Sequence, residues 1–301
     1  AVVVTSTSGG LVDGGAAHID ITANSGTVTI DAVTGVGSGN AIETQINTLD
    51  LDNTTSGNVD INETDALNIN QLDQDGAGTV NVDAGGTITV VAGQSGVTAT
   101  SGSVELDANG GSSNIVVNDG VTTTGGAVSL LADDDVTFSA DGDVASANGI
   151  VTVTADIAGG NNGGVITMAN GALIDAGSGT IALTADGDIT LGGLITTNAG
   201  GTAVVVTSTS GGLVDGGAAH IDITANSGTV VIDAKTGVGH AGNIDTTIAT
   251  LDLDNTTSGN VLINETNALT INKIDQDGSG TVNVDAGGTI TVVGPVTATT
   301  G

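Results

Sequence analysis

Residues 78–90 read GTVNVDAGGTITV, and residues 280–292 repeat these thirteen letters without a change. Within the first stretch, Val80 and Val82 alternate with polar residues, and so do Ile88 and Val90. A period of two is typical of a β-strand with one buried face, and the glycine pair between the two runs marks a turn. The unit therefore predicts all-β structure made of short strands and tight corners.

The repetition extends far beyond this unit. A shift of 202 places residues 1–91 on residues 203–293 without a gap, and 76 of these 91 positions are identical. A chain that repeats itself at this length is typical of an architecture in which each unit contacts only its neighbours. We interpret residues 1–301 as one continuous solenoid, with a first copy (1–100), diverged intervening coils (101–202) and a second copy (203–301).

The differences between the copies separate inward from outward positions. Thr29 becomes Val231 in the second copy, and each of these residues lies between apolar neighbours that do not change. The same holds at Asp60 and Asn68. Packing restricts inward positions more than outward ones. We therefore predict an inward set comprising Val28, Ile30, Leu49, Leu51, Val59, Ile61, Leu67, Ile69, Val80, Val82, Ile88 and Val90.

One segment differs more than the rest. Seven of the 15 differences lie between Ser38 and Asn47. Surface loops tolerate such change better than strands do. The density of differences predicts an outward loop here.

The spacing of the strands predicts how they stack. Strand-like runs cover 48–52, 58–62, 66–70, 79–83 and 87–91. Each run starts 18 to 21 residues after the run two places before it. We interpret this interval as one coil of a parallel β-solenoid, or β-helix, with Gly, Asn and Asp at its corners. At ~22 residues and ~4.8 Å per coil, 202 residues would make about nine coils.

The composition excludes several classes of partner. The chain carries two basic and 34 acidic residues, giving a net charge of −32 at pH 7. Phosphate binding requires clustered cations, so we expect no nucleic acid as a partner. Trp and Tyr are absent, which removes the flat surfaces on which sugars and bases usually stack. No apolar run approaches the length of a membrane span.

Two acidic turns are the candidate metal sites. Residues 73–79 (DQDGAGT) and 275–281 (DQDGSGT) resemble the first half of a calcium loop. The candidate calcium ligands are Asp73, Asp75, Asp275 and Asp277. An EF-hand would need Glu eleven residues after Asp73, where Ala84 stands. The residues thus allow two interpretations, a calcium site or a plain acidic turn, and the missing second half favours the turn.

Other chemistry finds little support in the sequence. His18 and His220 occupy the same repeat position, and a single histidine predicts an exposed residue at a strand entry rather than a metal cluster. Only Lys235 and Lys273 could assist a polysaccharide lyase, and both stand where the first copy has an uncharged residue. Two suitably spaced carboxylates would be enough for a hydrolase. We predict no enzymatic activity and keep a carbohydrate-active or carbohydrate-binding β-helix as the alternative.

The stretch from Gly179 to Gly193, GTIALTADGDITLGG, carries a family resemblance. It is similar to the strand–turn–strand unit of the repeat regions in large bacterial exoproteins of the filamentous haemagglutinin type and in autotransporter-like adhesins. The resemblance implies a right-handed parallel β-helix in a secreted, surface-anchored bacterial fibre. The expected function of such a fibre is to provide reach, rigidity and surface display. The expected partners are further repeats or copies of the same fibre and glycans of host or neighbouring cells.

Overall fold

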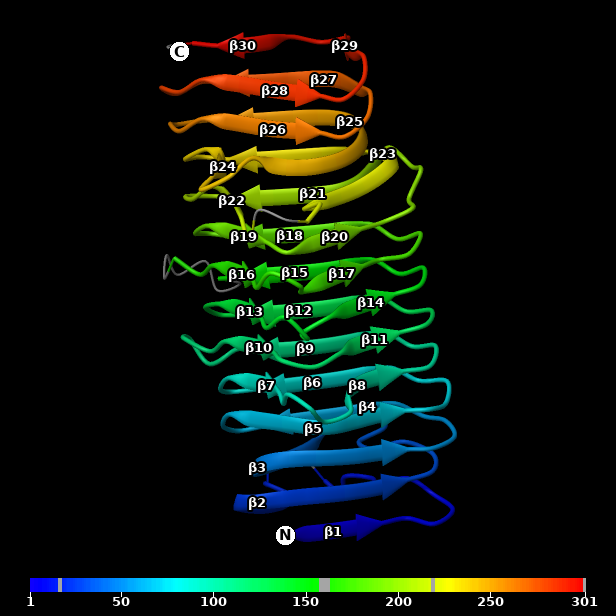
Figure 1. The fold of residues 1–301 in the computed structure, drawn as a ribbon. Coiled ribbons are helices and arrows are strands. Elements are labelled where there is room, and N and C mark those ends of the chain that lie inside the picture. Colours follow the sequence, from blue (N-terminus) through cyan, green and yellow to red (C-terminus); the bar gives the residue numbers. More distant parts are fainter. Residues whose placement is uncertain (16–17, 157–162, 218–219, 300–301) are drawn as a thin grey trace.

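The structure is a computed structural model, which describes residues 1–15, 18–156, 163–217 and 220–299. These residues form a parallel β-solenoid of about 12 turns, without a helix among them. The strands stack as rungs of a rod whose two chain ends lie at opposite ends (Figure 1). The described residues accordingly contain no apolar helix long enough to cross a membrane. The predicted fold class is confirmed.

The strands fall into three groups along the rod. The first copy forms β1 (Val2–Thr5), β2 (Ile21–Ala32), β3 (Ile42–Asn53), β4 (Val59–Glu63), β5 (Leu67–Gln74), β6 (Val80–Ala84), β7 (Ile88–Val90) and β8 (Gly96–Ala99). The second copy, with β21 leading into it, forms β21 (Thr202–Ser208), β22 (Leu213–Asp215), β23 (Ile223–Ala234), β24 (Val238–His240), β25 (Ile244–Asn255), β26 (Val261–Glu265), β27 (Leu269–Gln276), β28 (Val282–Ala286), β29 (Ile290–Val292) and β30 (Val296–Ala298).

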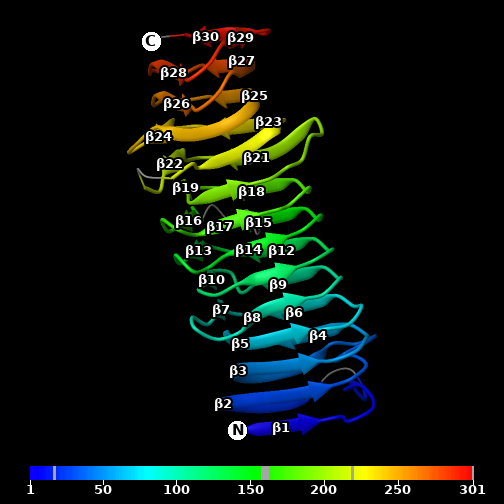
Figure 2. The same cartoon turned by 45° about the vertical axis from the view of Figure 1, so that its right-hand side comes forward.

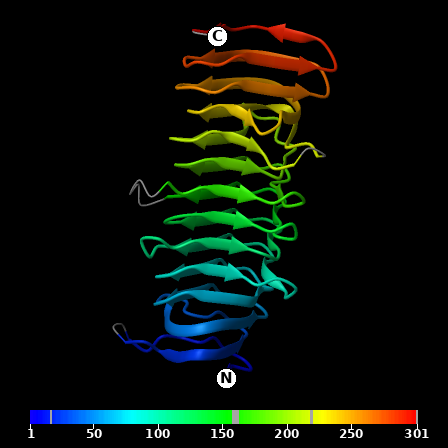
Figure 3. The same ribbon diagram turned by 60° about the vertical axis from the view of Figure 1, so that its left-hand side comes forward.

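In the central coils each turn contributes one strand to each of three faces. The first face holds β9 (Val104–Ala108), β12 (Val128–Ala132), β15 (Val151–Ala155) and β18 (Ile181–Ala185). The second holds β10 (Ile115–Val117), β13 (Val136–Phe138), β16 (Ile166–Met168) and β19 (Ile189–Leu191). The third holds β11 (Val121–Thr123), β14 (Val144–Ser146), β17 (Leu173–Asp175) and β20 (Gly193–Ile195). The strands run across the rod, and the connections lie along its edges (Figure 3).

The inward-facing residues form one core along the whole rod. All twelve predicted inward residues are at most 1% exposed. The parallel register stacks identical residues of successive coils on one another, since Val80 pairs with Val104 and Val104 pairs with Val128. Val59 pairs with Val80, 21 residues later, as the predicted coil length requires. Each coil therefore extends the same aliphatic core rather than starting a new one.

The predicted loop between Ser38 and Asn47 is wrong for most of its length. Strand β3 begins at Ile42, and Ile42 and Ile46 are buried. The differences between the copies fall on the outward positions of this strand, whereas Ile42, Thr44 and Ile46 recur as Ile244, Thr246 and Ile248. The alternation of changed and unchanged residues indicated a strand, and the density of differences concealed it.

The long repeat does not equal a whole number of turns. From Val59, eight steps of strand pairing lead along one face to Leu251. Figure 2 shows this column climbing through β4, β6, β9, β12, β15, β18 and β21. The equivalent of Val59 is Val261, which lies in the neighbouring column above β19, β22 and β24. The 202 residues thus make eight full turns plus one face of the next turn. Each segment of the second copy therefore lies one face further around the rod than its counterpart in the first copy.

A column of glycines lines one corner of the rod. A Cβ atom added to Gly78, Gly102, Gly126, Gly149 or Gly179 would lie 1.6–2.1 Å from the carbonyl oxygen of the glycine one coil below. Inward hydroxyls bind several of these carbonyls, as Thr123 Oγ1 does at Gly102 (2.7 Å) and Ser146 Oγ at Gly126 (2.7 Å). Only glycine allows the backbones of successive coils to approach this closely at the corner.

Candidate functional site: two acidic ladders

The outer surface of each copy carries a ladder of aspartates stacked on adjacent strands. In the first copy, Asp31 pairs with Asp52, and Asp52 pairs with Asp73. A threonine stands at each end, because Thr5 pairs with Asp31 and Asp73 pairs with Thr98. We call these five residues the first acidic ladder. The second acidic ladder consists of the equivalent residues Thr207, Asp233, Asp254, Asp275 and Thr297.

The parallel register creates these ladders directly. In-register strands place identical outward residues about 4.8 Å apart, which brings like charges together. Three of the four end threonines offset part of this repulsion with hydrogen bonds. Thr5 Oγ1 donates to Asp31 Oδ2 at 3.1 Å, and the hydroxyls of Thr98 and Thr297 donate to Asp73 and Asp275.

The middle carboxylate of the first acidic ladder has no such donor. Asp52 Oδ1 is buried without a hydrogen-bond partner. Burial raises the pKa of Asp52, and the charges of Asp73, Asp75 and Asp31 raise it further. Electrostatic repulsion at the centre of the first acidic ladder is therefore uncompensated.

In the second acidic ladder, Lys273 relieves this repulsion. Its Nζ forms an ion pair with Asp254 and lies 3.7 Å from Asp275 Oδ2. The hydrogen bond to Asp254 raises the pKa of Lys273, as expected for a cation held by carboxylates. The first copy has Gln71 at this position. The two ladders thus form a pair in which Lys273 of the second copy takes the place of the uncharged Gln71.

The four predicted calcium ligands occupy unequal positions. Asp73 and Asp275 are members of the two acidic ladders, whereas Asp75 is exposed in the turn that follows β5. Asp277 follows β27, and its backbone N donates to Asn255 O at 3.0 Å. Within the described residues, none of the four belongs to a group of three converging metal ligands. Calcium binding at these positions stays a prediction. The sequence reasoning missed Asp31 and Asp52, although the 21-residue spacing of Asp31, Asp52 and Asp73 was visible.

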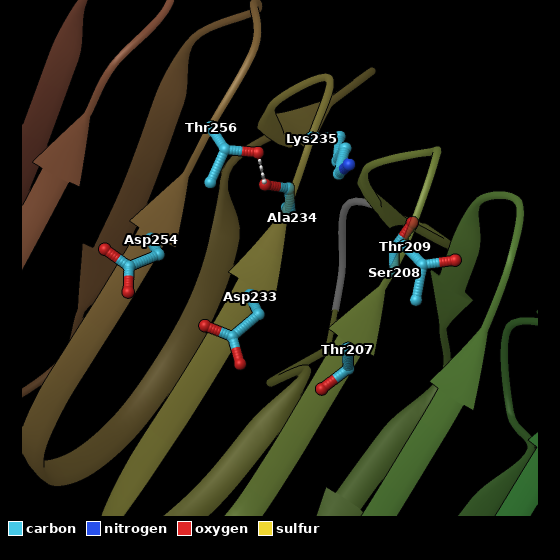
Figure 4. A pocket seen from close by; sticks show the side chains of 8 residues that line it. All are labelled: Thr207, Ser208, Thr209, Asp233, Ala234, Lys235, Asp254 and Thr256. Carbon is cyan, nitrogen blue, oxygen red and sulfur yellow. Dashed lines mark hydrogen bonds between the residues drawn. The ribbon is translucent and has the colours of Figure 1, made fainter.

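The lower end of the second acidic ladder borders a surface hollow of about 390 Å³. Figure 4 shows Asp233 and Asp254 side by side on neighbouring strands, with Thr207 below them and Lys235 at the edge. Its other lining residues are Ser208, Thr209, Ala234 and Thr256. Burial raises the pKa of Asp233, the charges of Asp254 and Asp252 raise it further, and Lys273 lowers it. The hollow thus offers two adjacent carboxylates, Asp233 and Asp254, with Lys235 among its lining residues.

Comparison with known protein families, with curated proteins and with solved structures found no match to this chain. Its function must therefore be argued from the geometry of the rod and its surface.

Exchanging Gln71 and Lys273 between the two ladders should move stability in opposite directions. We expect Gln71→Lys to stabilise the first copy by about 0.5–1 kcal/mol and Lys273→Gln to destabilise the second copy by a similar amount, as for other exposed ion pairs. Urea denaturation in low salt measures both effects. In 1 M NaCl both should vanish, because the Debye length falls to about 3 Å. Effects that persist in high salt would show that the charge is not the cause.

Stability should also rise as the pH falls from 8 to 5. Burial raises the pKa of Asp107 to about 6, and the charges of Asp83, Glu105 and Asp133 contribute in the same direction. Because the folded pKa exceeds the unfolded value of 3.8, the ionised group destabilises the fold above pH 6. This destabilisation is lost progressively as the pH falls through 6 towards 3.8.

The variant Asp107→Asn isolates this effect. We expect it to gain about 1 kcal/mol at pH 8, after the shift is discounted for solvent screening, and almost nothing at pH 4. Denaturant unfolding at both pH values provides the measurement. Asp186 is the control, because hydrogen bonds from Ser210 and Thr209 lower its pKa. Asp186→Asn should therefore not stabilise the protein at pH 8, and equal gains in both variants would contradict the account.

Proposed function

We propose that this chain is a structural segment of a long fibre on the outside of a bacterial cell, where it provides reach, rigidity and surface display. The observation that carries the proposal is the unbroken core. One column of paired inward residues runs from Val59 to Leu251 through eight turns. Such a stack resists bending and can be lengthened coil by coil without a new core.

Surface properties support the same role. A net charge of −32 keeps an elongated protein soluble and repels neighbouring acidic rods. The resemblance of residues 179–193 to filamentous haemagglutinin-type exoproteins agrees with a secreted adhesin stalk. Host or neighbouring-cell glycans are the external partners that we propose for it.

Further coils of the same fibre are the second proposed partner. Within the rod each coil pairs in parallel register with the coils on either side, as β6 does with β4 and β9. The same contacts can be repeated in further coils.

Labelling of intact source cells tests the proposed location and form. Antibodies against the exposed turn at Lys235 should bind unpermeabilised cells, and electron microscopy of the native protein should show filaments. Labelling that requires permeabilisation, or compact particles in place of filaments, would contradict the proposal.

The hollow beside Asp233 and Asp254 favours one alternative, a carbohydrate-active β-helix. Two carboxylates on one face can act as general acid and base on a glycosidic bond. The assay is depolymerisation of neutral and acidic polysaccharides by the wild type and by Asp233→Asn and Asp254→Asn. We expect no cleavage by any of the three. Cleavage by the wild type that both variants lose would establish the alternative.

A further inference from the structure

A histidine and two aspartates converge at one corner of the second copy, away from the acidic ladders. Asp215 ends β22, and His220 and Asp222 precede β23. Each of the three offers a ligand atom within 4.8 Å of those of the other two. The sequence predicted an exposed histidine here, but the side chain of His220 is only 22% exposed. This prediction suits His18 in the first copy, whose side chain is 64% exposed.

The coils below and above hold Asp222 in place. Asp222 O accepts a hydrogen bond from Leu194 N at 2.8 Å, and Asp222 N donates to Asp245 O at 2.8 Å. Its side-chain Oδ2 accepts a bond from Asp245 N at 2.7 Å. The backbone of Asp222 is thus held by the coils on both sides and its carboxylate by the coil above, and such pre-organisation favours ligand binding.

The second oxygen of this carboxylate is unsatisfied and directed into the cluster. Asp222 is fully buried, and its Oδ1 has no hydrogen-bond partner. This oxygen lies 3.2 Å from His220 Nε2. Nε2 also donates a hydrogen bond to Gly192 O at 2.9 Å, so a metal that binds at Nε2 must displace this proton, which leaves to solvent. A buried carboxylate oxygen without a donor is costly unless a cation compensates it.

We propose that Asp215, His220 Nε2 and Asp222 Oδ1 bind a divalent metal ion of the zinc class. One imidazole nitrogen with two carboxylate oxygens suits zinc and its neighbours, whereas calcium and magnesium prefer oxygen alone. Three protein ligands leave one coordination position open. His220 also lines a surface hollow of about 230 Å³, which gives water or a small ligand access to this corner.

The first copy provides an internal comparison. Its equivalent corner gathers Asp13, Asp20 and Glu43, an all-oxygen set. His18 Nε2 lies 3.2 Å from Asp20 Oδ1, but this imidazole is mostly exposed and Asp20 is not fully buried. We therefore place the zinc site at the corner of the second copy, where the coil below, with Gly192 and Leu194, is described.

Zinc titration of the whole chain by isothermal calorimetry tests the proposal, with a Co²⁺ absorption spectrum as an independent readout. We expect one tight site, with d–d bands of a low-coordinate nitrogen and oxygen set. His220→Ala should weaken zinc binding about 10–100-fold or more. His18→Ala, at the same repeat position in the first copy, should leave the affinity unchanged.

Three results would overturn the assignment: no zinc binding by the wild type, unchanged affinity in His220→Ala, or equal weakening in His18→Ala. Circular dichroism of each variant verifies that the rod is folded. If Asp222→Asn unfolds the chain, His220→Gln provides the second test, because the side chain of His220 is partly exposed. This variant also loses the ligand nitrogen, so it should lower the zinc affinity as much as His220→Ala does. A tenfold excess of Ca²⁺ should not displace the bound zinc, and displacement would contradict the proposed ligand preference.

Discussion

Gly126→Ala should destabilise the rod by at least about 3 kcal/mol, which places it among the most damaging substitutions in the chain. The added Cβ would lie 2.1 Å from Gly102 O and 2.3 Å from Gly102 C, both backbone atoms of the coil below. Backbone cannot move aside as the end of a flexible side chain can. The coils would have to separate at this corner, which breaks the parallel ladder on both adjoining faces.

Urea denaturation combined with hydrogen exchange measures this effect. We expect a lower midpoint and faster exchange in the strands next to the corner, Val121–Thr123 and Val128–Ala132. Gly201→Ala is the matched control, because a Cβ there would meet no atom within 4 Å. If both variants unfold at the same denaturant concentration, the close approach of coils does not explain the glycine column.

Glu63→Ala should destabilise the first copy by about 3–5 kcal/mol, because it leaves buried donors without their acceptor. Glu63 is 1% exposed and ends β4 with its carboxylate inside the rod. It accepts hydrogen bonds from Thr44 Oγ1 at 2.6 Å, from Ile46 N at 3.0 Å and from Asp65 N at 3.1 Å. In all three contacts the oxygens of Glu63 are the acceptors.

The second copy repeats the arrangement at Glu265. There Thr246 Oγ1, Ile248 N and Asn267 N donate at 2.7, 2.9 and 2.8 Å. Glu265→Ala should therefore cost about as much as Glu63→Ala, whereas Glu105→Gln, on an exposed outward position, should cost little. Unfolding midpoints and the exchange rates of the Ile46 and Asp65 amides are the measurements. Unchanged protection of these two amides in Glu63→Ala would show that the carboxylate does not hold them.

The sequence predicted what depends on local alternation. A period of two identified the core residues from Val28 to Val90, and the spacing of the runs predicted the length of a coil. Features that depend on register between coils could not be read in the same way. To predict the role of Glu63, one must know the position of β3 in the coil below. To predict the glycine column, one must know the distance between the backbones of successive coils. Glu63 and its donor Thr44 do recur unchanged in the second copy, which was the available signal.

The candidate sites show the same division. Asp73 and Asp275 stood out because of their turn sequence, yet their structural partners are Asp52 and Asp254 on the adjacent strand. The corner at His220 escaped the sequence analysis because its ligands are defined by burial. Asp20 and Asp222 are the same residue of the repeat, but only Asp222 is fully buried. Identical sequence in two copies therefore does not imply identical chemistry.

The central claim is that the protein is a rod that lengthens coil by coil. The length of an extended chain tests this claim most directly. The chain to measure carries one additional copy of residues 1–202 ahead of residue 203. Eight turns and one further face at ~4.8 Å per turn predict that small-angle X-ray scattering will show a maximum dimension greater by about 40 Å, with an unchanged cross-sectional radius. An added copy that widens the particle and leaves its length unchanged would contradict the account.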